Sequence, residues 1–135
     1  MDPHGLPPRI KKSLEKKDVK YMGIPNICFS LTDPKDSREA EYRKMRIEQG
    51  FDPSETWSLF STISGFIEPR LRYFAEQHGG HPPYFSPEEW EEILLKMADA
   101  FKYINERESC VDDRNKALID EGLDLFRKYF FRLWN

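Results

Sequence analysis

Two pairs of acidic residues stand at a spacing that lets carboxylates share one side of a helix. Glu89 and Glu92 lie three residues apart in the segment EWEE, and Glu121 and Asp124 lie three residues apart in EGLD. Carboxylates on facing helices can hold Mg²⁺, which neutralises phosphate groups and activates water for hydrolysis. These four residues are the candidate catalytic residues of the sequence.

This arrangement resembles the E-x-x-E and E-x-x-D motifs with which the all-α nucleoside triphosphate pyrophosphohydrolases hold magnesium. The helical phase of the four acids opposes that role here. At 100° per residue, Glu89 and Glu92 point roughly 90° to 150° away from the apolar side of their helix, and Glu121 and Asp124 roughly 140° or more from theirs. We therefore expect the acids on solvated faces and no catalysis, with a magnesium-dependent hydrolase kept as the alternative function.

Two of the three histidines occur in HGGHPPYF, residues 78 to 85, and raise the question of a metal site. His78 and His81 would share a face only in a helix, whereas the glycines between them and the prolines after them favour a connector between two helices. Cys28 and Cys110 lie far apart and outside any C-x-x-C pattern, and are expected to be ordinary thiols. The sequence therefore predicts no metal and no cofactor.

Two helix starts are marked by the same device. In DPSE and SPEE, Asp52 and Ser86 are placed as N-caps, proline follows at the first helical position, and a glutamate three residues after the cap completes a capping box. Pro69 interrupts the first of these helices. The residue four before it is Gly65, whose missing Cβ eases a bend, so a kink is expected there rather than a break.

Two further helices are predicted from weaker signals. A polar helix is expected to begin at Asp33 and Pro34 in TDPKD and to stop at Gly50, a residue suited to a helix C-terminus. The last helix is expected to begin at Asp112 or Asp113 and to run almost to the end of the chain.

Each of the three long helices carries an apolar stripe at steps of three and four, which places the stripe on one helix face. No strand period competes, so the predicted fold is all-α: a compact bundle of three long helices plus a shorter polar N-terminal helix. The stripes are the predicted core and comprise Trp57, Phe60, Ile63, Ile67, Leu71 and Phe74; Trp90, Ile93, Leu94, Met97, Phe101 and Ile104; and Ile119, Leu123, Phe126, Phe130 and Leu133.

Two of these helices carry more apolar residues beside the main stripe, and Gly122 in the last helix allows another backbone to approach closely. If 135 residues do not cover all of these side chains, they form an apolar patch suited to a partner protein or a second copy. The candidate partner-binding residues are Leu59, Phe66, Tyr73, Leu125, Tyr129 and Trp134.

The first 50 residues carry a net positive charge, and the rest of the chain carries a net negative charge. Residues 1–50 carry 11 Lys and Arg against 8 Asp and Glu, whereas residues 51–135 carry 10 against 16. We expect an irregular basic segment over 1–31 and a single helical domain over 32–135. A surplus of three charges is far weaker than that of a true basic tail, so we do not expect nucleic-acid binding and keep it only as an alternative function. Its candidate residues are Lys11, Lys12, Lys16, Lys17 and Lys20.

The longest apolar runs, such as residues 93 to 95, are far shorter than the roughly 20 residues of a membrane span. The basic N-terminus is not followed by the apolar stretch of a secretory signal. No membrane partner is expected, and a cytoplasmic location follows by default.

Three segments, ETWSLFSTISGFIEPRLRYFAE, EEWEEILLKMADAFKYI and EGLDLFRKYFFRLW, resemble a family of small helical proteins of tailed bacteriophages and prophages. The resemblance covers roughly residues 52–135 and consists of core positions. It implies an all-α viral protein and brings no assigned activity with it. The leading hypothesis is therefore a phage-type helical protein that acts in the host cytoplasm through protein contacts, by assembly or by binding a host factor.

Overall fold

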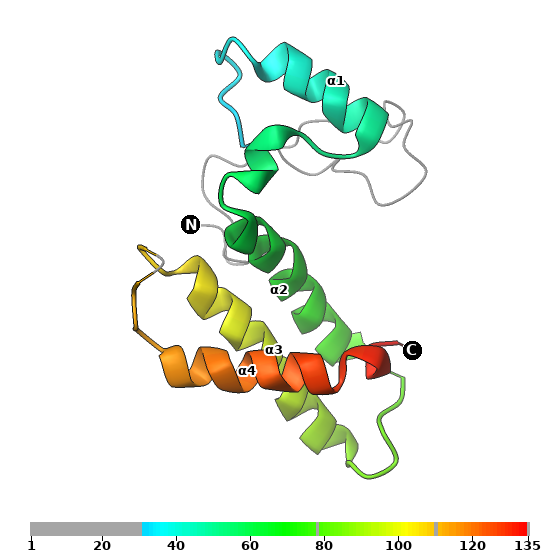
Figure 1. Cartoon of the computed structure of the whole chain (residues 1–135). Helices are drawn as coiled ribbons and strands as arrows, with labels where there is room; N and C mark the ends of the chain where they lie inside the picture. The colour runs from blue at the N-terminus through cyan, green and yellow to red at the C-terminus, as the bar shows by residue number, and fades with distance from the viewer. Residues whose placement is uncertain (1–30, 78, 110, 135) are drawn as a thin grey trace. The chain divides into compact units, whose positions relative to one another are not determined.

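The computed structural model describes residues 31–77, 79–109 and 111–134, and over these residues the chain is helical without strands (Figure 1). The prediction of an all-α fold is confirmed for this part of the chain. The elements in order are α1 (Glu39–Gln49), the 3-10 helix η2 (Pro53–Thr56), α2 (Leu59–Gln77), α3 (Pro87–Asn105), α4 (Lys116–Lys128) and the 3-10 helix η3 (Phe130–Arg132).

The described residues form two compact units, and the boundary between them falls inside α2, between Thr62 and Ile63. The first unit contains α1, η2 and the start of α2, and the second contains the rest of α2 with α3, α4 and η3. The prediction of a single domain over 32–135 stays a prediction, and the irregular segment 1–31 lies outside the described residues except for its last position.

The first unit is organised around a buried arginine. The side chain of Arg46 on α1 is fully buried and donates to Asp52 Oδ2 at 2.5 Å and to Glu39 Oε1 at 2.6 Å. Asp52 also caps η2, because its carboxylate accepts from the Ser54 N–H at 2.8 Å while the Glu55 carboxylate accepts from the Asp52 N–H at 2.9 Å. The predicted capping box is confirmed, and one aspartate joins it to α1.

The helix predicted to start at Pro53 is a different structure. Pro53–Thr56 forms only the short 3-10 helix, and the α-helix starts at Leu59. Asp52 accepts from the amide two residues on, which favours a tight turn over an α-helical one. From Leu59 the helix continues through Pro69 to Gln77, so no break occurs at the proline, as predicted.

The predicted starts of the polar helix and of the last helix are also wrong, by several residues. α1 begins at Glu39, because the Asp33 and Asp36 carboxylates accept from the amides two residues on and fold that segment into turns. α4 begins at Lys116, because Asp112 accepts in the same way from the Arg114 amide.

Three helix signals work as predicted. Gly50 ends α1 in the left-handed region at φ 88°, and its N–H donates to the Arg46 carbonyl at 3.0 Å. Ser86 accepts from the Glu89 N–H three residues on, Pro87 is the first residue of α3, and the capping box is complete.

The core of the second unit lies where α3 meets α4 and the later part of α2. Four of the six predicted residues of the α3 stripe are buried, and the other two pack against them. The N-terminal part of the α2 stripe is wrong, since Trp57, Phe60 and Ile63 are exposed, and so are Leu123 and Phe130 of the last stripe. The buried core cluster consists of Leu71, Ala75, Trp90, Leu94, Met97, Ala98, Phe101 and Tyr129.

The crossing of α3 and α4 is close because a glycine stands at the contact (Figure 1). A Cβ added to Gly122 would lie 2.6 Å from the Lys96 carbonyl oxygen and would overlap the Ala100 side chain. Gly122 is buried and Ala100 is fully buried. The approach that the sequence predicted for Gly122 is thus confirmed, and it is made by the backbone of α3.

Gly122→Ala should destabilise the fold by about 1–3 kcal/mol, because the added methyl group has no room at the crossing. On an open helix face the same change would stabilise the fold by roughly 0.5–1 kcal/mol, so a loss of stability would itself indicate the close crossing. Urea unfolding of both proteins measures the difference. Gly79→Ala is the control, since nothing lies within 4 Å of a Cβ there; an equal effect of the two changes would contradict the close crossing.

Arg46→Met should destabilise the segment from α1 to η2 by about 3–5 kcal/mol, because it leaves the Asp52 carboxylate buried without its cation. Hydrogen exchange of the α1 amides measures the loss, which should persist in high salt because buried pairs are weakly screened. Lys44→Met, an exposed charge on the same helix, should change exchange by no more than about 0.5 kcal/mol. Unchanged exchange in Arg46→Met would refute the anchoring role.

Candidate binding surface

The four candidate catalytic acids do not assemble into a site. Glu89 accepts from the Ser86 N–H at 2.9 Å as part of the α3 cap. Glu121 pairs with Lys96 at 3.0 Å, Glu92 lies 3.9 Å from the same ammonium group, and Asp124 is exposed. Across the described residues, no group of three or more histidine, cysteine or acidic side chains has metal-binding geometry.

The electrostatics of these acids fit structural roles. Hydrogen bonds from Ser86, first from its backbone N–H and then from its hydroxyl, hold the pKa of the Glu89 carboxyl below its usual value. The hydrogen bond to Glu121 and its charge raise the pKa of the Lys96 ammonium. Glu89 therefore stabilises the start of α3, and the Lys96–Glu121 pair joins α3 to α4 at the surface.

Residues 79–86, between α2 and α3, are non-helical, as the sequence predicted. His81 lies with its Nδ1 3.0 Å from the Pro82 carbonyl oxygen, and the Phe85 N–H donates to the same carbonyl at 3.0 Å. His78, Cys28 and Cys110 lie outside the described residues.

The predicted partner-binding residues divide into exposed and buried groups. Leu59, Phe66, Tyr73 and Trp134 are exposed, by 37% at Phe66 and by 72% at Trp134. Tyr129 and Leu125 instead belong to the interior: Tyr129 is a member of the core cluster and Leu125 packs against it. The exposed members on α2 lie along one helix, whereas Trp134 stands among other aromatic side chains at the chain end.

Three aromatic side chains near the end of the chain form what we call the C-terminal surface: Phe130, Phe131 and Trp134, exposed by 52%, 88% and 72%. α4 ends at Lys128, and η3 then carries the chain in a tighter turn. Sequence reasoning missed Phe131 and placed Phe130 in the core. The signal that marks this surface is the run RKYFFRLW, in which cations and aromatic residues follow one another and no acid occurs after Asp124.

A ladder of edge-to-face ring contacts leads from the core to this surface. Phe101 in the core contacts Phe126 at a centroid distance of 5.1 Å, Phe126 contacts Phe130 at 5.4 Å, and Phe130 contacts Phe131 at 5.6 Å. Such contacts fix ring orientation and add to the energy of area burial. The exposed rings of Phe130 and Phe131 are therefore oriented by contacts that lead back to the core.

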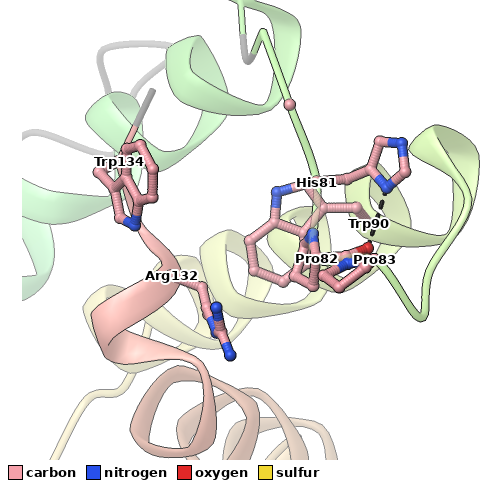
Figure 2. A pocket seen from close by; sticks show the side chains of 7 residues that line it. His81, Pro82, Pro83, Trp90, Arg132 and Trp134 are labelled. Atoms are coloured by element: carbon pink, nitrogen blue, oxygen red, sulfur yellow. Dashed lines mark hydrogen bonds between the residues drawn. The ribbon is translucent and has the colours of Figure 1, made fainter.

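A hollow of about 250 Å³ lies beside Trp134 (Figure 2). The indole rings of Trp90 and Trp134 stand on opposite sides of it, and the Arg132 side chain lies below them in the view (Figure 2). Trp90 is fixed in the core, where its ring is 5.8 Å from Tyr129 and 6.2 Å from Phe85. The side chains that line the hollow are His81, Pro82, Pro83, Trp90, Arg132 and Trp134.

Comparison of the chain with protein-family models, with curated proteins and with solved structures gives no match. Among the described helices, none combines the length and the apolar character that crossing a bilayer requires. The candidate site of the structure is the C-terminal surface together with the adjacent hollow.

Glu89→Ala should lower the melting temperature at neutral pH and have little effect in acid. Because the folded-state pKa of Glu89 is depressed, its stabilisation is present above the unfolded pKa of about 4.5 and is lost as the pH falls through the folded value. Thermal unfolding between about pH 7 and pH 3 measures this difference. Glu88→Ala, in the same turn but outside the capping box, is the control; an effect of Glu89→Ala that does not vary with pH would contradict the charged cap.

Proposed function

We propose that this protein acts through protein–protein contacts made by the C-terminal surface, without catalysis. The observation that carries the proposal is the exposure of Phe131 and Trp134, by 88% and 72%, within four residues of each other. Exposed aromatic clusters mark interaction sites because aromatic residues are enriched in the centres of interfaces and dominate their energetics.

The ring ladder supports this proposal on energetic grounds. Burying a phenylalanine side chain is worth roughly 1.5–3 kcal/mol. Binding loses part of this gain when it must immobilise a free side chain. Phe130 and Phe131 are already oriented by their contacts with each other and with Phe126, so docking requires less additional ordering. A surface prepared in this way suits a protein partner or a second copy of the chain.

The proposal extends to the finer predictions made from the sequence. We take α2, α3 and α4 as a bundle of three long helices, and the cytoplasm of a host cell as the place of action. An origin in a tailed bacteriophage is proposed on the resemblance of residues 52–135 to that family. Neither alternative function gains an observation: the four acids form no metal group among the described residues, and the basic lysines of residues 11–20 lie outside them.

The double variant Phe131→Ser, Trp134→Ser tests the proposal. If the C-terminal surface mediates self-association, sedimentation velocity should show wild-type oligomers at micromolar concentration and at least about tenfold weaker association in the variant, since two aromatic side chains no longer become buried. The variant should keep the wild-type melting temperature, because both side chains are exposed.

Val111→Ser, Leu118→Ser is the matched control, since these residues are exposed by 79% and 49% but lie away from the chain end in sequence. It should associate like the wild type. For the host-factor form of the proposal, a partner retained from host extract must be lost in the Phe131, Trp134 variant and kept in the control. A wild-type monomer at every concentration, with no partner that depends on these two residues, would refute the proposed function.

A further inference from the structure

The hollow beside the C-terminal surface has a chemistry of its own, and we propose that it binds a carboxylate that stands next to an apolar side chain in a partner peptide. This inference rests on the proposed function and specifies the partner: a protein segment that presents an acid, either a side chain or a chain end, beside an aromatic or aliphatic residue.

Arg132 supplies the cation. Its side chain lines the hollow and takes part in no hydrogen bond or ion pair within the described part of the chain. A guanidinium group offers donors in a planar fork that matches a carboxylate, and such bidentate pairs are among the strong hydrogen bonds of proteins. Arg132 is thus positioned beside a concave space, and no described residue accepts from its guanidinium group.

The rest of the wall suits an apolar side chain. Trp90 and Trp134 stand on opposite sides of the hollow, and the rings of Pro82 and Pro83 lie beside Trp90 (Figure 2). Trp90 is 1% exposed and Pro82 is buried, so this wall is part of the packed fold. Apolar walls with a single charged group that fixes orientation are typical of specific ligand sites.

Charge in the surrounding segment favours an acidic partner. Arg127 and Lys128 precede Arg132 in the last turn of α4, and no acid follows Asp124 among the described residues. The region from residue 51 onward is acidic as a whole, with 16 Asp and Glu against 10 Lys and Arg. Complementary charge steers association and excludes wrong partners. The C-terminal end of this chain therefore selects against a basic peptide.

The concave shape of the hollow favours a peptide over a flat anionic surface as its partner. A bilayer contacts exposed cations and aromatic residues such as Arg127 and Phe131, but it does not enter a hollow walled by Trp90. A short peptide can place one side chain between the two indole rings and its carboxylate on Arg132. The contribution of Arg132 relative to Arg127 is consequently the feature that separates the two kinds of partner.

Three tripeptides test the inference by NMR titration of the ¹⁵N-labelled protein. They are N-acetyl-Gly-Pro-Phe with a free carboxylate, the same peptide as its C-terminal amide, and N-acetyl-Gly-Glu-Phe amide. We expect the indole N–H signals of Trp90 and Trp134 to shift with a carboxylate-bearing peptide and not with the neutral amide. Trp57, in the first unit, is the internal control and should not respond. The first and third peptides distinguish a chain end from an acidic side chain.

Arg132→Gln should weaken binding of the responding peptide about tenfold or more, because a hydrogen-bonded charge pair is lost. Arg127→Gln, a matched change that does not line the hollow, should leave binding within about twofold of wild type. The inference is overturned if the neutral amide binds equally well, if no peptide shifts either indole, or if both variants weaken binding alike. Equal weakening of binding to phosphatidylglycerol vesicles by both variants, without peptide binding, would point to an anionic surface instead.

This experiment can fail independently of the proposed function. If the variant Phe131→Ser, Trp134→Ser loses association and no peptide binds, the proposed role of the C-terminal surface is supported. The proposed binding of a peptide in the hollow is then refuted. Peptide binding that depends on Arg132, with no partner that depends on Phe131, would support the hollow alone.

Discussion

The close crossing of α3 and α4 at Gly122 is the constraint on which the second unit depends. Because a side chain at position 122 has no space against Ala100 and the Lys96 carbonyl, the two backbones approach more closely than ordinary side chains permit. That approach brings Phe126 onto Phe101 and Tyr129 onto Trp90, each by an edge-to-face contact. Phe130, which contacts Phe126, is placed by the same crossing.

Most of the helices are readable from the sequence, but their starts depend on a distinction that the sequence does not display. Ser86 accepts from the amide three residues on and begins an α-helix. Asp33, Asp52 and Asp112 accept from the amide two residues on, and each forms a turn or a 3-10 helix instead. Aspartate suits both geometries, so Asp52 is an N-cap as predicted but of a 3-10 helix, whereas the helix starts predicted at Asp33 and Asp112 are wrong and α1 and α4 have Arg38 and Asn115 as N-caps.

The site was less readable than the fold, for a physical reason at the end of α4. A stripe extended at 100° per residue places Phe130 with the core and Tyr129 beside it. The core-facing side of α4 instead passes through Ile119 and Gly122, and Tyr129 continues it with an N–H bond to the Leu125 carbonyl, so Tyr129 is 8% exposed and Phe130 is 52% exposed. The α3 stripe, which lies inside one uninterrupted helix, was predicted correctly from Trp90 to Phe101.

Several arginines of the described chain pair with carboxylates, in contrast to Arg127 and Arg132 near its end. Arg46 is paired with two carboxylates in the interior of the first unit, and Arg72 lies 2.9 Å from Asp99 and 3.4 Å from the buried Glu68. Arg114 pairs with Asp112 at 2.7 Å.

In an acidic protein, an arginine finds a carboxylate wherever the chain places one nearby, and such pairing satisfies the cation within the fold. Arg127 and Arg132 stand where the sequence supplies no acid beyond Asp124, and neither has a carboxylate partner in the described part of the chain. Arg132 in addition lines a hollow with apolar walls, and no described residue supplies a carboxylate to it there.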